Sequence, residues 1–294
     1  MSTRRIALLA AATLCLVVLL FLLLHHPEET SDNAPALGPD LTGDRKDAGS
    51  NRSRATAHNL TLTIIYDNNE FDNRLDTGWG FSCLVEGPEE IILFDTGADS
   101  RMLLSNMKIL GIDPEDIDAV VISHIHQDHV GGLSGLLGVY SDLRVYLPSH
   151  FPDSVKETVT GHGAELVEVD GPVEICDRVY STGELGTSIR EQSLLIDTEK
   201  GLVLIAGCAH PGIVNIVREA RNQLQRGIYL AIGGFHLHWA GSGEIEGIVR
   251  SMRDEGVEMV GPCHCSGDLA RSIFEREYGD DFVRIGVGTV LELG

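Results

Sequence analysis

Four side chains of the kinds that bind metal ions lie within six residues of one another. His124, His126, Asp128 and His129 follow the apolar run 119–122 and precede a pair of glycines. Imidazole nitrogens and carboxylate oxygens suit a borderline metal such as zinc. A loop at the end of a strand can turn neighbouring side chains toward one point, so His124 and His126 can hold one ion while Asp128 and His129 reach a second. The alternative, a histidine-rich surface turn, does not explain why the cluster directly follows a buried strand.

This cluster predicts a hydrolytic enzyme that acts on a small molecule. A bound zinc ion lowers the pKa of water toward about 7 and polarises an ester, amide or phosphate oxygen. We therefore expect one or two divalent ions as cofactor, zinc in the first place, with Mn²⁺ and Fe²⁺ as alternatives. Asp128 is a catalytic candidate as well as a ligand, because its carboxylate can orient the attacking water or carry away its proton.

The stretch from His124 to His129 resembles the H-x-H-x-D-H signature of the metallo-β-lactamase superfamily, and further landmarks follow in the order typical of that family. The resemblance implies that Asp95 supports the site by hydrogen-bonding a ligand. It implies an α/β fold, an αββα four-layer sandwich with the metals at one rim of the sheets. It also implies two metal positions, whose ligands are His124, His126 and His210 for the first and Asp128, His129 and His264 for the second.

A narrower likeness joins five segments, 67–69, 79–82, 207–213, 233–237 and 262–267, to one subgroup. They are similar to proteins labelled dihydropterin-ribofuranosyl-aminobenzene-phosphate synthase-like. This likeness implies group transfer as an alternative reaction. Within these segments Trp79 and Phe81 are candidates for a pocket wall, with a core role as the alternative for Phe81. Asn68 and Asn69 either present amides to a substrate or form a turn.

The chain departs from the family in the interval between His210 and His264. Hydrolases of this fold commonly place there an Asp that bridges the two metals, and β-lactamases place a Cys. Here Asp254 lies in a predicted helix and the interval holds no Cys. His236, after a predicted strand, therefore either takes the bridging position, hydrogen-bonds the catalytic water, or only lines the pocket.

The six cysteines are too sparse for a disulfide framework in a domain of this size. Cys263 and Cys265 share one face of an extended segment and His264 takes the other, which favours two buried thiols and one imidazole at the site. A thiolate metal site is the alternative. Cys208, two residues before His210, is open to the same two interpretations.

Three classes of function follow from these residues. We favour hydrolysis of an ester, lactone or phosphoester over group transfer, and both over an iron-dependent redox or non-catalytic metal-binding role. A phosphate-bearing substrate would need a nearby cation, for which Arg74 and Arg101 are closest in sequence. The 44 acidic and 22 basic residues give a net charge of −22, which argues against a nucleic acid as partner.

Strands that alternate with helices predict an α/β layered fold over one domain, residues 58–294. The expected strands are 60–66, 81–86, 91–94, 119–122, 144–147, 193–196, 202–206, 228–232 and 283–287. The expected helices are 101–110, 213–226, 244–255 and 266–278.

The N-terminal part predicts a membrane anchor. Residues 6–24 are apolar and uncharged, and as a helix at ~1.5 Å per residue they span roughly 28 Å, the thickness of a bilayer core. Arg4 and Arg5 precede this run, so residues 1–5 are expected in the cytoplasm and the catalytic domain on the extracytoplasmic side. Residues 25–57 predict a flexible tether. A cleaved signal peptide is the alternative, but the run is long and ends without a small-x-small site.

Overall fold

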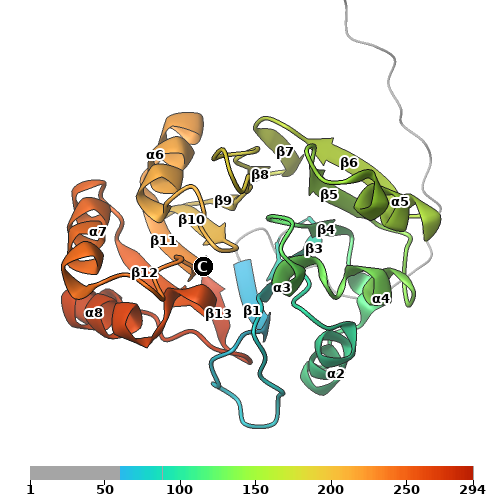
Figure 1. Ribbon diagram of the computed structural model, residues 1–294, viewed down its shortest axis with the longest axis horizontal. Helices are drawn as coiled ribbons and strands as arrows, with labels where there is room; N and C mark the ends of the chain where they lie inside the picture. The colour runs from blue at the N-terminus through green and yellow to red at the C-terminus, as the bar shows by residue number, and fades with distance from the viewer. Residues whose placement is uncertain (1–59, 88, 294) are drawn as a thin grey trace, which may run out of the picture. The chain divides into compact units, whose positions relative to one another are not determined.

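A computed structural model describes residues 60–87 and 89–293, which form two β-sheets with helices on their outer faces (Figure 1). The first sheet has the strand order β13-β1-β2-β3-β4-β5-β6. Its strands are β1 (Leu60–Tyr66), β2 (Ser82–Glu86), β3 (Ile91–Phe94), β4 (Ala119–Val121), β5 (Arg144–Pro148), β6 (Glu165–Val169) and β13 (Val290–Leu293).

The second sheet has the order β12-β11-β10-β9-β8-β7. Its strands are β7 (Val173–Cys176), β8 (Val179–Ser181), β9 (Leu194–Thr198), β10 (Gly201–Ala206), β11 (Ile228–Gly234) and β12 (Met259–Cys263). The α-helices are α2 (Ser100–Leu110), α3 (Gln127–Val130), α4 (Leu133–Leu137), α5 (Asp153–Gly161), α6 (Ile213–Leu224), α7 (Ser242–Asp254) and α8 (Asp268–Tyr278).

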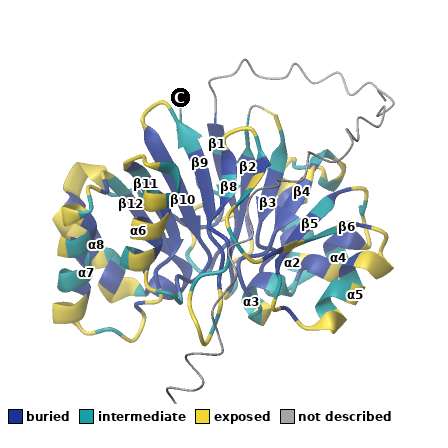
Figure 2. Cartoon of the chain, turned by 90° about the horizontal axis from the view of Figure 1, so that it is seen from above, coloured by how far each residue is buried: buried dark blue, intermediate teal, exposed yellow. Residues whose placement is uncertain are grey.

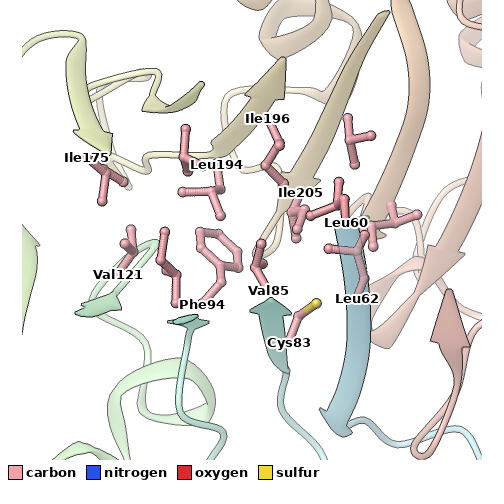
Figure 3. Close-up of a cluster of buried hydrophobic side chains, with 14 of the residues drawn as sticks. Leu60, Leu62, Cys83, Val85, Phe94, Val121, Ile175, Leu194, Ile196 and Ile205 are labelled. Carbon is pink, nitrogen blue, oxygen red and sulfur yellow. The ribbon is translucent and has the colours of Figure 1, made fainter. Parts of the chain in front are cut away.

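Three apolar clusters hold four layers together. One lies between the sheets and includes Val85, Phe94 and Ile205 (Figure 3). The other two join each sheet to its own helices: α2, α4 and α5 cover the first, and α6, α7 and α8 the second. Buried residues therefore line the strands, while exposed residues gather on the outer helices (Figure 2). This is the αββα sandwich that the sequence resemblance implied.

Strand β10 shows why the strands read as continuous apolar runs. All six of its residues are buried. Val203 and Ile205 face the other sheet, whereas Leu202 and Leu204 face the helices. Because both faces are covered, the usual alternation of apolar and polar residues is replaced by apolar residues on both sides.

The strand directions bring several loops to one edge of the sandwich. β3 runs parallel to β4, and β10, β11 and β12 run parallel to one another. β1 is antiparallel to β2, which is antiparallel to β3, so β1 ends at the same edge as β3. The segments that follow these strands therefore meet, although they are far apart in the chain.

Most expected elements are confirmed within one or two residues, and one is wrong. Residues 283–287 form no strand and contribute only an isolated bridge at Val287, because the chain reaches the first sheet seven residues later than expected, as β13. The sequence analysis missed α5, β7 and β8. It also missed β6, whose residues are largely exposed or half-buried, and β12, which contains Gly261 and Pro262. β12 is an edge strand, where proline is tolerated.

The N-terminal predictions, residues 1–5, 6–24 and 25–57, lie outside the described residues. Within residues 60–87 and 89–293, no helix combines the length and apolar character needed to cross a membrane.

Candidate metal centre

The structure brings together the three histidines expected at the first metal position. His124 Nε2 lies 3.1 Å from His126 Nδ1, which in turn lies 3.2 Å from His210 Nε2. Nitrogens bound tetrahedrally to one zinc ion at its usual bond length lie about 3.3 Å apart. These two separations fit a single ion bound by all three nitrogens, which lie within 4.8 Å of one another.

The second group gathers Asp128, His129 and His264, together with a residue not assigned to it from the sequence, Cys208. His264 Nε2 lies 3.3 Å from Asp128 Oδ2, and His129 Nε2 lies 3.7 Å from the same oxygen. The Cys208 sulfur lies 3.2 Å from His129 Nε2. All four ligand atoms lie within 4.8 Å of one another.

The backbone is strained where the strands deliver these residues. Among the described residues, six non-glycine residues have a positive φ: Asp95, Arg178, Ala209, Gln225, His236 and His264. Four of the six, all but Arg178 and Gln225, follow strands that end at the common edge. Left-handed backbone is costly for residues with a Cβ and tends to occur at functional sites.

Asp95 sets the tautomers of two ligands through one oxygen. Its Oδ2 accepts hydrogen bonds from His129 Nδ1 and from the Ser123 hydroxyl, each 2.7 Å long. The hydroxyl lies 2.9 Å from His124 Nδ1 and, since it donates to Asp95, must accept from that nitrogen. When each ring carries a single proton, the Nε2 atoms of His124 and His129 therefore hold the lone pairs that a zinc ion would need.

Asn68 performs the same task for His264. Its side-chain oxygen accepts from His264 Nδ1 at 3.0 Å, and the backbone N–H of His264 donates to Asp67 at 3.1 Å. His264 Nε2 is buried and has no hydrogen-bond partner. It lies 3.3 Å from the Asp128 carboxylate, so either a proton or a metal cation must lie between these two atoms, and the pair marks a candidate cation site.

Glu191 shapes the loop after β10, and the sequence analysis missed it. Its buried carboxylate accepts the backbone N–H groups of Cys208, Ala209 and His210, each at 2.8 Å. No local motif marks Glu191, because it lies 17 to 19 residues before the groups that it binds. Gly207 is needed beside this loop, since a Cβ there would lie 2.1 Å from the Ser123 hydroxyl.

The pKa shifts leave two of the candidate histidine ligands neutral and a third protonated. Burial and the neighbouring histidines lower the pKa of His124, and they lower the pKa of His210 to about 4, so both rings are neutral at pH 7. Burial alone would lower the pKa of His129, but the Asp95 carboxylate outweighs it and raises that pKa to about 9, so a metal ion that binds this ring would displace a proton. Burial alone would raise the pKa of Asp128, but His264 and His129 hold it below its usual range, so Asp128 is ionised.

The residues predicted to line a substrate pocket divide between the site and the core. Trp79 is half exposed, and its ring centre lies 5.0 Å from that of His264, so it borders the second group. Phe81 is fully buried between the sheets against Phe94, which corrects the pocket assignment in favour of its core role. Asn69 bonds to Asp67 and Arg271 and so holds the loop after β1.

His236 lies beside the first group and outside both ligand sets. Its side chain is exposed, and its ring centre lies 4.3 Å from that of His210. Its ligand nitrogen shares a third group with the sulfurs of Cys208 and Cys265. Cys263 packs in the core between the sheets, as the simpler interpretation expected.

Neither arginine named for a phosphate group is free of a carboxylate. Arg74 pairs with Asp72 at the surface. Arg101 pairs with Asp99 and is almost fully exposed. Their charges are thus largely compensated where they lie.

Comparisons with known proteins agree with this arrangement. The family model described as the metallo-beta-lactamase superfamily matches residues 78–214. The chain is 29% identical over 262 residues to the 7,8-dihydropterin-6-methyl-4-(beta-D-ribofuranosyl)-aminobenzene-5'-phosphate synthase of Methanocaldococcus jannaschii, covering 72% of this chain and 89% of that protein. It is 34% identical over 80 residues to the hydroxyacylglutathione hydrolase of Serratia proteamaculans, covering 27% of this chain and 30% of that one.

Solved structures show the same fold. Tm1679, a metal-dependent hydrolase of the beta-lactamase superfamily, is 30% identical with a TM-score of 0.66, over 80% of this chain and 99% of its own. The metallo-beta-lactamase fold protein YhfI from Bacillus subtilis, at 15% identity and a TM-score of 0.60, covers 80% and 99% and shares the fold. The chain belongs to the metallo-beta-lactamase superfamily.

Proposed function

We propose that this protein is a metal-dependent hydrolase that acts on an ester, lactone or phosphoester of a small molecule. The observation that carries the proposal is the convergence of two ligand sets at one edge of the sheets, where the buried His264 Nε2 has no other partner. The likeness to Tm1679, which is described as a metal-dependent hydrolase, supports the same reaction class.

The ligand chemistry favours zinc. His124, His126 and His210 would hold the first ion, and Asp128, His129 and His264 the second, since nitrogen and carboxylate oxygen are zinc ligands at these separations. When bound, such ions supply a Lewis acid and activate water as a nucleophile near neutral pH. Mn²⁺ and Fe²⁺ are the alternatives that remain.

The residues of the chain divide the remaining tasks. Asp128, whose side chain is 20% exposed, can accept a proton from the attacking water and orient it. Asp95 fixes the geometry of His129 and, through Ser123, of His124. The exposed ring of His236 lies beside His210, where it can hydrogen-bond the substrate or donate a proton to the leaving group.

Group transfer is the second candidate, and the 29% identity to the Methanocaldococcus synthase over most of both chains favours it. The two reactions differ in what reaches the reacting centre. Hydrolysis places a solvent oxygen in the product and needs one organic substrate, whereas transfer needs a second one. Product analysis in ¹⁸O-labelled water therefore separates them.

The test starts with metal content and turnover of the full chain. We expect one or two equivalents of zinc by plasma mass spectrometry and activity in a screen of esters, lactones and phosphoesters. His126→Ala should lose both metal and activity, whereas His162→Ala, which replaces an exposed histidine bonded to Ser134, should retain both. Substoichiometric metal that His126→Ala leaves unchanged would remove the basis for an enzyme.

We also propose that residues 6–24 anchor the enzyme in a membrane with the catalytic domain on the extracytoplasmic side. The uncharged apolar run behind Arg4 and Arg5 supports this arrangement. Resistance to alkaline carbonate extraction, together with protease access to the catalytic domain from the outer side, should be observed. Release of a shortened chain into the medium would favour the cleaved signal peptide.

A further inference from the structure

The thiol of Cys208 lies beside the three side chains expected at the second metal position. Its sulfur is 3.2 Å from His129 Nε2 and belongs to the group formed by Asp128, His129 and His264. A sulfur and a nitrogen bound tetrahedrally to one zinc ion lie about 3.5 Å apart, given bond lengths of about 2.3 and 2.05 Å. The observed separation is close to this value.

A hydrogen bond between Cys208 and His129 alone does not account for the group. It would satisfy His129 Nε2, but it leaves His264 Nε2, which is buried and aimed at the same point, without a partner. It also leaves that nitrogen 3.3 Å from the Asp128 carboxylate. A cation in the middle satisfies all of these atoms at once, because each of them offers an electron pair to it.

We propose that the Cys208 thiolate is the fourth ligand of the second metal position. The proposal rests on the proposed metal centre and specifies its chemistry. Asp128 and Cys208 together supply two negative charges, which neutralise a divalent ion. The thiol loses its proton to solvent when the metal binds.

A thiolate changes which metals this position selects. Sulfur ligands favour zinc, cobalt and cadmium, whereas manganese and magnesium prefer oxygen. The second position should therefore discriminate against manganese more strongly than a site with a bridging carboxylate. The thiolate also supplies the negative charge that a bridging acid would provide, which Asp254 cannot supply because it lies in helix α7.

Cys265 provides a matched control. Its sulfur lies near the Cys208 sulfur and a ring nitrogen of His236, but outside the group of Asp128, His129 and His264, and it donates to the Cys208 carbonyl at 3.7 Å. Both cysteines are buried, and serine is close in size to cysteine. Cys208→Ser removes a sulfur from the second group and from the group with His236, whereas Cys265→Ser removes one from the group with His236 alone.

The experiment is cobalt substitution of the full chain, with cobalt content measured by plasma mass spectrometry. The wild type should show a thiolate-to-cobalt charge-transfer band in the near ultraviolet. Cys208→Ser should lose the band and bind cobalt at one position at least about 100-fold more weakly. Mutation of a residue that only hydrogen-bonds a ligand already lowers metal affinity about 10- to 100-fold, and the loss of a ligand should cost at least as much. Cys265→Ser should retain the band.

Three results would overturn the assignment while leaving the metal centre intact: cobalt bound without the band, the band kept in Cys208→Ser, or the band lost in Cys265→Ser alone. If the wild type binds no cobalt or zinc, the proposed function fails too. X-ray absorption of the zinc-loaded wild type does not depend on any variant folding. It should show sulfur at about 2.3 Å from zinc, and a zinc shell of nitrogen and oxygen only would contradict the proposal.

Discussion

Replacing Asp95 with asparagine should weaken metal binding at both positions through the tautomers of two histidines. Asp95 Oδ1 accepts the backbone N–H of Ser123 at 2.7 Å, and Oδ2 accepts from the Ser123 hydroxyl and from His129 Nδ1. The backbone N–H can only donate, so the oxygen of the new amide stays opposite it and the NH₂ group takes the place of Oδ2. His129 must then accept at Nδ1 and carries its proton on Nε2, where the metal would bind.

The same change reverses the bond from Ser123 to His124. Once the Ser123 hydroxyl accepts from the new NH₂ group, its own proton turns to His124 Nδ1, 2.9 Å away. Loss of such supporting bonds costs 10- to 100-fold in metal affinity, or about 1.4 to 2.8 kcal/mol at each position. Ser123→Ala removes only the hydroxyl that links Asp95 to His124, so it should weaken metal binding at the first position alone.

The assay is zinc competition with a chromophoric chelator, which resolves two positions of different affinity. Asp118→Asn is the matched control, because Asp118 precedes β4 at the end far from Ser123 and accepts the Ile91 N–H at 2.9 Å. Circular dichroism verifies that each variant is folded. Wild-type affinity at both positions in Asp95→Asn, or equal weakening of both positions in Ser123→Ala, would refute the tautomer argument.

Three further expectations follow from the structure. In Glu191→Gln an NH₂ group would face backbone N–H groups that donate to the carboxylate in the wild type. The melting temperature should therefore fall by an amount equivalent to about 1–3 kcal/mol of stability. An unchanged melting temperature in calorimetry would contradict this role of Glu191. Trp79→Ala should raise KM more than it lowers kcat, because the ring borders the second group, while Phe71→Ala, exposed in the same loop, should change neither. Burial alone would raise the pKa of Glu184, but hydrogen bonds from His150, Arg190 and Ser149 lower it from 4.5 to about 2. The ionised Glu184 therefore stabilises the fold fully at a pH above 4.5, its pKa in the unfolded chain. This stabilisation disappears as the pH falls toward 2. Urea unfolding should therefore show Glu184→Gln less stable than the wild type at pH 7 and nearly equal to it near pH 2.

The sequence by itself determined the features that depend on residues close together in the chain, namely several strands and the local cluster of metal-binding side chains. Runs rich in apolar and β-branched residues predicted β1 and β3 with their observed bounds, although β1 also contains Thr61 and Thr63. The cluster from His124 to His129 was recognisable because its ligands lie within six residues after a strand. His210 and His264 were identified through resemblance to family motifs.

Only the tertiary structure decided which distant residues complete these groups. Cys208 lies 79 residues from His129, and Asp67 lies 197 residues from His264, so no local pattern joins the members of either pair. His236 was the sequence candidate for the missing bridge because it follows a strand in the expected interval, yet its exposed ring lies outside both ligand sets. The loops after β1, β3, β4, β10, β11 and β12 share one edge because strand direction and pairing order bring them there. Periodicity records which face of an element is buried, whereas contacts between loops depend on the position of every strand in both sheets.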